Sequence, residues 1–137
     1  WRPSMSEILV NKLTGTSTAG SILVTGEGNS TTTNLQQGLA KAWVNFDGTT
    51  SGLTIRDSLN NSSMTDHTTG DYTTTFANAM GNAGFSCNTC AGTGSVTTQS
   101  QIQSLQGIST TSIRTLTYDG SAFDRTYVMN QISGDLA

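Results

Sequence analysis

The chain has 137 residues, a formal net charge of −3 and a charged fraction of only 11%. Its six Lys and Arg residues are scattered, whereas a protein that binds nucleic acid gathers basic side chains against the phosphates, so nucleic acid is not an expected partner. No apolar run reaches the roughly 18 residues of a membrane-spanning helix, and none forms the ~7–15-residue apolar core of a secretory signal peptide. We therefore expect neither membrane insertion nor a signal peptide.

The composition favours β-structure. Thr, Ser, Gly and Asn make up about half of the chain. Such a polar mixture also occurs in disordered segments, but those usually carry many charges. Thr is β-branched and fits a pleated strand, and Gly permits tight turns. We expect a single body over residues 34–137, preceded by an N-terminal arm and linker over residues 1–33.

Two short apolar runs stand apart in the N-terminal region. They are separated by a stretch of Thr, Ser and Gly, and neither run is long enough to bury itself. We interpret the region as an extended arm or hairpin that docks on a neighbouring subunit. Met5 resembles a natural start, so we expect residues 1–4 to be an extension. The expected docking residues are Ile8, Leu9, Val10, Ile22, Leu23 and Val24.

One segment, from Asn34 to Trp43, is the helical candidate. Asn34 is a good N-cap residue. Leu35, Leu39 and Trp43 recur at a spacing of four, which places them on one face of a helix. Gly38 argues against a long helix, because glycine is about 1 kcal/mol less favourable than alanine within a helix. The stripe predicts a short helix that packs on the core or at a subunit interface.

From residue 41 onward the apolar period changes to two, which indicates strands. Asp47-Gly48 and Asp119-Gly120 are strong turn signals, and residues 60–70 are so rich in turn residues that we expect a loop. The expected fold is an all-β, antiparallel β-sandwich or jelly-roll-like domain with an extended arm and one short helix. The expected strands are residues 41–47, 53–60, 71–76, 85–90, 95–105, 112–118 and 125–132.

Exposed sheet edges would invite pairing with other chains. The chain has two Lys and one Pro with which to block such edges. Its charge-poor surface is also unusual for a soluble monomer. Both features favour a homo-oligomer in which neighbouring copies cover the edges.

Cys87 and Cys90 form an isolated C-x-x-C pair. Positions three apart on a strand face opposite sides of the sheet, so a disulfide within the pair would be strained. A structural zinc site needs four ligands, and the chain has a single His. We expect two ordinary small residues, with metal binding or redox chemistry as the alternatives.

No catalytic constellation emerges, so we expect no enzyme activity, no catalytic residue, no metal site and no cofactor. Glycoside hydrolysis needs two carboxylates about 5–9.5 Å apart, but Asp is also a standard turn residue. Residues 66–71 offer oxygen ligands for Ca²⁺ without the spacing of an EF-hand loop. We interpret the Asp and His residues of these loops as candidate receptor contacts instead, because recognition is commonly carried on loops. These residues are Asp66, His67, Asp71, Asp119 and Asp124.

Large apolar residues in the strands are expected to lie in the core or at a subunit interface. Aromatic side chains at a surface also stack on sugars or anchor interfaces, but an alternating strand favours burial. Besides Leu35 and Leu39 of the helical stripe, the set comprises Trp43, Phe46, Tyr72 and Phe76.

Four segments together resemble a module of marine, cyanophage-type tailed bacteriophages. They are KAWVNFDGT at 41–49, IRDSLNNSSMTD at 55–66, TTGDYTTTFANAM at 68–80 and YVMNQISGD at 127–135. The module occurs in fibre-like and appendage proteins, and it is used in virion fibres, host-receptor binders and head decorations. The resemblance implies a trimeric, β-sandwich-like domain, and it transfers no catalytic residue.

The resemblance and the composition lead to one functional expectation. We expect a non-enzymatic structural protein on the virion surface, either a head decoration (cement) protein or a short fibre protein. Its partners would be copies of itself, as a trimer, and capsid or tail proteins of the same particle. The alternative is a receptor-binding adhesin of a tail fibre that recognises a host-surface glycan or protein.

Overall fold

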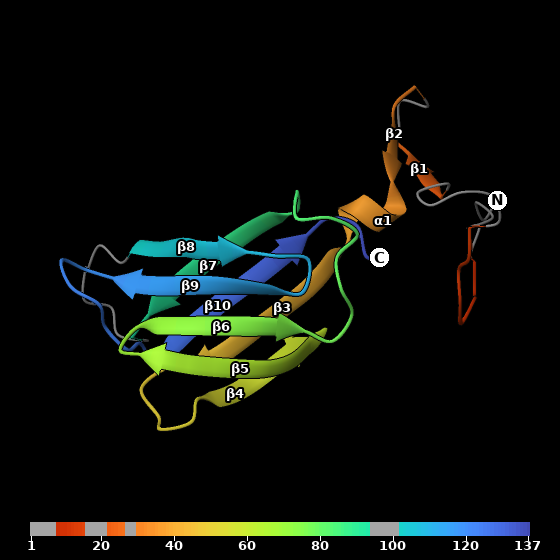
Figure 1. Cartoon of the computed structure of the whole chain (residues 1–137). Helices are drawn as coiled ribbons and strands as arrows, with labels where there is room; N and C mark the ends of the chain where they lie inside the picture. The colour runs from red at the N-terminus through yellow and green to blue at the C-terminus, as the bar shows by residue number, and fades with distance from the viewer. Residues whose placement is uncertain (1–7, 16–21, 27–29, 94–101) are drawn as a thin grey trace, which may run out of the picture.

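A computed structural model describes residues 8–15, 22–26, 30–93 and 102–137, and the expectations that fall on residues 1–7, 16–21, 27–29 and 94–101 lie outside it. The body is a sandwich of two four-stranded antiparallel sheets that face each other (Figure 1). The prediction of an all-β sandwich is confirmed.

The first sheet has the strand order β4-β3-β10-β7, and the second has the order β5-β6-β9-β8. The strands of the first sheet are β3 (Ala40–Asp47), β4 (Thr54–Leu59), β7 (Ser86–Gly92) and β10 (Tyr127–Ser133). Those of the second are β5 (Asn61–Thr68), β6 (Asp71–Phe76), β8 (Ile102–Ile108) and β9 (Ser112–Tyr118).

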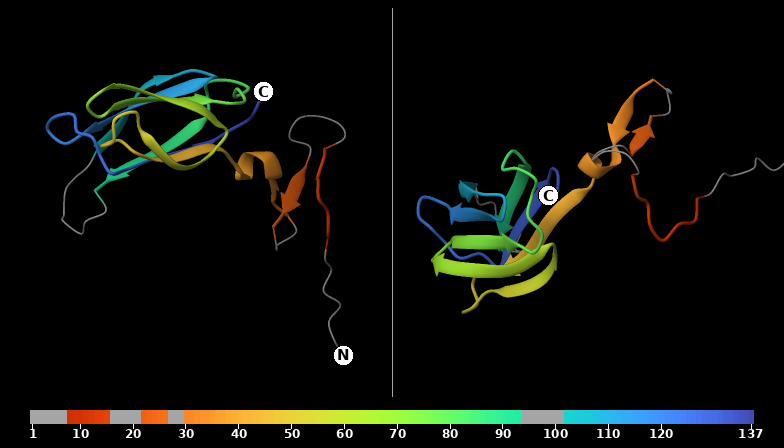
Figure 2. Two further views of the ribbon diagram at one scale, coloured as in Figure 1. Left: turned by 90° about the horizontal axis from the view of Figure 1, so that it is seen from below. Right: turned by 45° about the vertical axis from the view of Figure 1, so that its right-hand side comes forward.

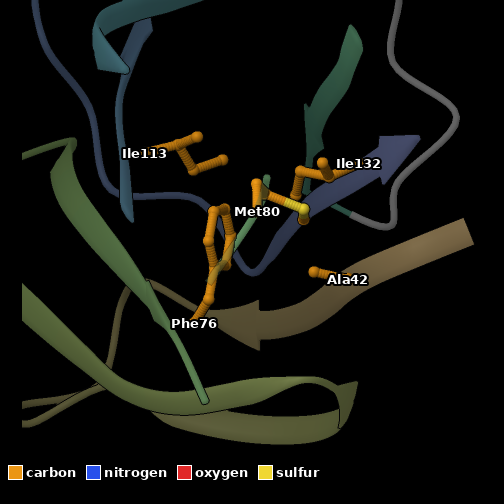
Figure 3. Close-up of a cluster of buried hydrophobic side chains, with 5 residues drawn as sticks. All are labelled: Ala42, Phe76, Met80, Ile113 and Ile132. Carbon is orange, nitrogen blue, oxygen red and sulfur yellow. The ribbon is translucent and has the colours of Figure 1, made fainter. Parts of the chain in front are cut away.

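The core lies between the two sheets, because every second residue of a strand points to the same side. In β3, Val44 and Phe46 are buried, whereas Trp43, which alternates with them, faces outward. One buried cluster joins β3 and β10 to β6 and β9, as Figure 3 shows. It consists of Ala42, Phe76, Met80, Ile113 and Ile132.

A second buried cluster contains Val44, Phe46, Tyr72 and Val128. The rings of Phe46 and Tyr72 meet edge to face, with centroids 5.0 Å apart. This arrangement is favourable for aromatic pairs and adds to the burial of their surface. It ties the two sheets together near the end of β3 and the start of β6.

The expected loop over residues 60–70 is wrong, because residues 61–68 form strand β5. Asn60 has a positive φ of 54°, so the chain turns sharply from β4 into β5 and crosses to the other sheet. The Asn60 side chain accepts a hydrogen bond from the Asn78 backbone amide at 2.6 Å. Pairing with β6 therefore overrides a composition that is typical of turns.

The actual turn between β5 and β6 is confined to residues 69–70. Gly70 has a φ of +73°, and a Cβ there would lie 2.8 Å from the carbonyl oxygens of Thr117 and Phe123. Only glycine allows this close approach of three chain segments.

The helix is much shorter than the expected one. Helix α1 covers only Leu35–Gly38, and Asn34 caps it by accepting a 2.8 Å hydrogen bond from the Gln36 amide. Strand β3 begins two residues later, so Trp43 belongs to that strand and not to a helical stripe. Leu39 is 54% exposed and Leu35 is half-buried. Gly38 and the period-two pattern that follows it account for the early end.

The arm projects away from the sandwich at the start of β3 (Figures 1 and 2). Strands β1 (Leu23–Thr25) and β2 (Thr32–Asn34) form a small antiparallel ladder within it. Residues 8–15 belong to no helix or strand. In the part of the chain that the structure describes, no helix has the length and apolar character to cross a bilayer.

Candidate functional site

The arm exposes most of the apolar side chains it carries, and we call these residues the arm surface. Ile8 and Leu9 are 83% and 82% exposed, which is far more than apolar residues of a folded body show. Ile22 is the half-buried member of the expected docking set. The arm surface comprises Ile8, Leu9, Val10, Leu13, Leu23 and Val24.

A groove of about 390 Å³ runs over the outer face of the first sheet. This volume lies within the ~300–1,000 Å³ typical of ligand pockets. The strand register places its lining residues side by side. Met129 pairs with both Asn45 and Cys90, and Gln131 pairs with both Trp43 and Asn88. We call it the sheet groove, and its outward-facing side chains are those of Trp43, Asn45, Asn88, Cys90, Met129 and Gln131.

Strand β4 extends this face beyond the sheet groove. Leu59 pairs with Trp43 and is 46% exposed, and Asp57 pairs with Asn45. The Asp57 carboxylate accepts a hydrogen bond from the Ser58 amide at 2.8 Å, and no ion pair joins it to a cation among the described residues. This edge of the face therefore combines an apolar side chain with an uncompensated negative charge.

An aromatic and cationic group lies at the end of the same face. Arg56 donates a 2.8 Å hydrogen bond to Asp47, and its guanidinium carbon lies 4.3 Å from the centre of the Tyr127 ring. Hydrogen bonds from the Thr49 hydroxyl and amide, followed by the Arg56 charge, hold the pKa of the Asp47 carboxyl below its usual value. The face thus gathers Trp, Tyr, Met and Arg, the residue types that are enriched at protein interfaces.

The outer face of the second sheet has a different character. Thr73 and Thr75 alternate with the buried residues of β6, and their partners across the sheet are Thr, Ser or Arg. Its main charged feature is the bidentate pair of Arg114 with Asp71, at 2.8 and 2.6 Å. The hydrogen bonds from Arg114 and its charge lower the pKa of the Asp71 carboxyl, although partial burial opposes them. This face is mainly polar, although the half-buried Leu116 and the exposed Tyr118 of β9 lie on the same side as Arg114.

The acidic residues expected on receptor loops lie in different settings. Asp71 is held by Arg114, as described above, and Asp119 lies 3.7 Å from Arg125. Asp66 and His67 belong to strand β5 and not to a loop, and the His67 imidazole hydrogen-bonds the Thr73 hydroxyl at 2.9 Å. The structure therefore does not gather these side chains on one loop.

Asp124 is the residue whose role the sequence did not indicate. One of its carboxylate oxygens accepts hydrogen bonds from both the Gly70 amide and the Tyr72 hydroxyl, each at 2.7 Å. Burial of Tyr72, together with the hydrogen bond to the Asp124 carboxylate and its charge, raises the pKa of the tyrosine well above its ordinary value. Through these two hydrogen bonds, Asp124 links the segment before β10 to the β5–β6 turn and the start of β6.

The two cysteines lie on opposite faces of β7, as the spacing predicted, and both are free thiols. Cys87 packs against the first core cluster, and burial raises the pKa of its thiol to about 11. Cys90 is exposed in the sheet groove. Among the described residues, no group of three or more His, Cys, Asp or Glu side chains has an arrangement suited to a metal ion.

Asn130 was not predicted as a core residue, yet it is 2% exposed between the sheets. It accepts a hydrogen bond from the Gln103 amide at 3.1 Å and donates one to the Thr74 hydroxyl at 3.3 Å. Buried polar side chains are normally satisfied in this way. The alternation of Val128, Asn130 and Ile132 in the sequence is the signal that would have placed it inside.

Comparison of the chain with protein-family models, with curated proteins and with solved structures finds no match.

Proposed function

We propose that this chain is a non-enzymatic structural protein that joins a larger assembly through its N-terminal arm. The observation that carries the proposal is the arm surface, whose Ile8 and Leu9 are more than four-fifths exposed. Full burial of such a side chain contributes about 1.5–3 kcal/mol. A contiguous set of exposed apolar side chains is typical of a site that binds a partner.

The division of the molecule into two parts supports this reading. The body has its own core, in which Phe46, Ile113 and Ile132 expose none of their surface. The arm lies outside that core and projects from one end of the sandwich (Figure 2). A folded body with an unpartnered arm is suited to linking neighbouring subunits.

The kind of assembly is proposed from the sequence. The four segments that resemble the phage module favour the surface of a tailed phage particle, where the protein would be a head decoration or a short fibre. Three of the four aspartates considered for receptor contact already have partners within the chain, namely Asp71, Asp119 and Asp124. We therefore assign the binding role to the arm and not to the loops.

Incorporation into particles tests the proposal. Phage that encode the chain would be grown with Leu9→Asp, or with Thr65→Asp as the matched control on the polar outer face. Because Leu9 is 82% exposed, the substitution should leave the body folded. We expect purified particles to contain the Thr65→Asp protein at the normal level and to lack the Leu9→Asp protein. Normal incorporation of Leu9→Asp would refute the assignment of the arm.

Immunogold labelling of the same particles locates the protein. Gold spread over the head would identify a decoration protein, and gold on the tail or its appendages would identify a fibre protein. No label on intact particles would refute the proposed place on the virion surface.

A further inference from the structure

The outer face of the first sheet has the chemistry of a protein-binding surface. Trp43 and Met129 line the sheet groove, and Tyr127 with Arg56 lies at its end. Met129 and Tyr127 are each 38% exposed, so apolar surface is open to a partner. The outer face of the second sheet presents mainly Thr and Ser, and its large apolar groups are Leu116 and Tyr118 of β9. The outer face of the first sheet, which holds the groove with Trp43 and Met129, is therefore the face better suited to an apolar occupant.

The chain itself carries a segment of matching chemistry. Residues 8–13 contain four of the six arm-surface residues, and they are not engaged in a helix or strand. An extended segment rises about 3.3 Å per residue, so six residues span about 20 Å. This length is comparable to the four-strand width of the sheet, since neighbouring strands lie about 4.8 Å apart.

Charge supports the same pairing. Lys12 is the one charged residue within the described ranges of the arm, 8–15, 22–26 and 30–33. On the receiving face, Asp57 has no ion-pair partner in the part of the chain that the structure describes, whereas Asp47 is paired with Arg56. A cation on the arriving segment would compensate the carboxylate that the face leaves unpaired.

We infer that residues 8–13 of one copy lie in the sheet groove of a second copy, against Trp43 and Met129. This inference rests on the proposed function, because it names the first partner of the arm. The contact is heterologous, since the arm of each copy meets a different surface on the next copy. Such contacts close when the rotation between copies allows it: a reciprocal exchange of arms between two copies gives a two-fold dimer, and exchange around a three-fold axis gives a trimer.

Cys90 provides a native probe of the contact, because its thiol is exposed in the sheet groove. Ile8, Leu9 and Val10 would be changed to Cys one at a time in the full chain, followed by mild oxidation. Cys87 should not compete, since it faces the core. We expect at least one variant to form reducible, covalently linked dimers and larger species on a non-reducing gel.

Matched variants make the result specific. Replacement of Cys90 by Ser should abolish the cross-link, which separates an arm–groove disulfide from a disulfide between two arms. Thr65→Cys, on the polar outer face, should cross-link at least 10-fold less. Cross-links that persist with Cys90→Ser would refute the inference. A disulfide to Cys90 within the same chain, seen as an oxidised monomer, would do so as well.

Light scattering at micromolar concentration gives an independent readout. We expect the unmodified chain to be oligomeric and Met129→Glu to be monomeric, with Thr73→Glu as the oligomeric control on the other face. An unmodified monomer, or a Met129→Glu protein with an unchanged mass and an unchanged circular dichroism spectrum, would overturn the inference. The two proposals fail separately: a chain that needs its arm for incorporation but shows no Cys90 cross-link retains the proposed function and loses the inferred partner.

Discussion

The body and the arm differ in how they place apolar side chains. In the body, Phe46 and Ile113 are fully buried, and polar residues such as Asn130 and Thr74 are hydrogen-bonded to each other. In the arm, Leu9 and Val10 are 82% and 59% exposed. The same apolar residue types therefore stabilise the fold in one region and remain available to a partner in the other. Stability of the isolated chain should depend on the body, and assembly should depend on the arm.

The largest expected effect is a change in the core of the body. Phe46→Ala should reduce the free energy of unfolding by about 3–5 kcal/mol, because it removes a fully buried ring and leaves a cavity. Leu9→Ala in the arm should change it by less than about 0.5 kcal/mol, as expected for an exposed position. Urea denaturation of both variants, followed by circular dichroism, measures the difference.

Varying the protein concentration separates the effect of the arm on folding from its effect on assembly. If assembly adds stability, the Leu9→Ala protein and the unmodified chain should unfold alike when dilute and diverge as concentration rises, because association stabilises the folded state by mass action. A loss above about 2 kcal/mol for Leu9→Ala in dilute solution would place the arm in the fold of its own chain and contradict the division into two regions.

The second largest effect is expected at Asp124, which joins two segments of the body. Asp124→Ala should cost about 1–3 kcal/mol, because the Gly70 amide and the buried Tyr72 hydroxyl lose their common acceptor. Asp124→Asn should cost less, since both hydrogen bonds end on the same oxygen and an amide oxygen is able to replace it. Equal losses for Ala and Asn would show that the charge, and not the acceptor, is what matters.

The role of Asp124 shows where the sequence stops being informative. Period-two alternation predicted the sandwich and most strands, because the period of a strand is a local property. The sheet groove depends on the pairing of β3, β10 and β7, which are distant in sequence, so no local pattern places Trp43, Met129 and Cys90 together. The contact of Asp124 with Gly70 depends on the same kind of long-range pairing. Strand β5 was missed because its Asn and Ser residues are typical of turns, although β6 supplies the hydrogen bonds of its backbone.

Tyr72 predicts a loss of body stability at alkaline pH. Its pKa is raised in the folded state, so the fold favours the neutral phenol. The stability that this provides is complete below the unfolded pKa of about 10 and is lost as the pH rises above that value. The thermal midpoint of unfolding should therefore decline less steeply for Tyr72→Phe than for the unmodified chain between about pH 10 and 11.5.

Tyr127→Phe is the matched control for this alkaline effect, because Tyr127 is 38% exposed on the outer face. It should leave the pH dependence of the thermal midpoint unchanged. A decline that is as steep in Tyr72→Phe as in the unmodified chain would show that another group is responsible.

The smallest effect is expected from the ion pair on the polar outer face, between Arg114 and Asp71. Its geometry is bidentate, but Arg114 is exposed and solvent screens the pair, so pairs of this kind contribute little.

The pKa of Asp71 is lowered in the folded state, so the contribution of the ion pair to stability is present above the unfolded pKa of about 3.8 and is lost as the pH falls through the folded pKa. Asp71→Asn should thus be slightly less stable than the unmodified chain at pH 7, and this difference should shrink as the pH falls below about 3.8. A double-mutant cycle with Arg114→Gln should yield a coupling that shrinks in 1 M salt, where the screening length is about 3 Å. A coupling that stays constant in salt and exceeds the Asp124→Ala loss would mean that the polar face stabilises the body as strongly as its internal contacts do, and the contrast between the two outer faces would then have to be redrawn.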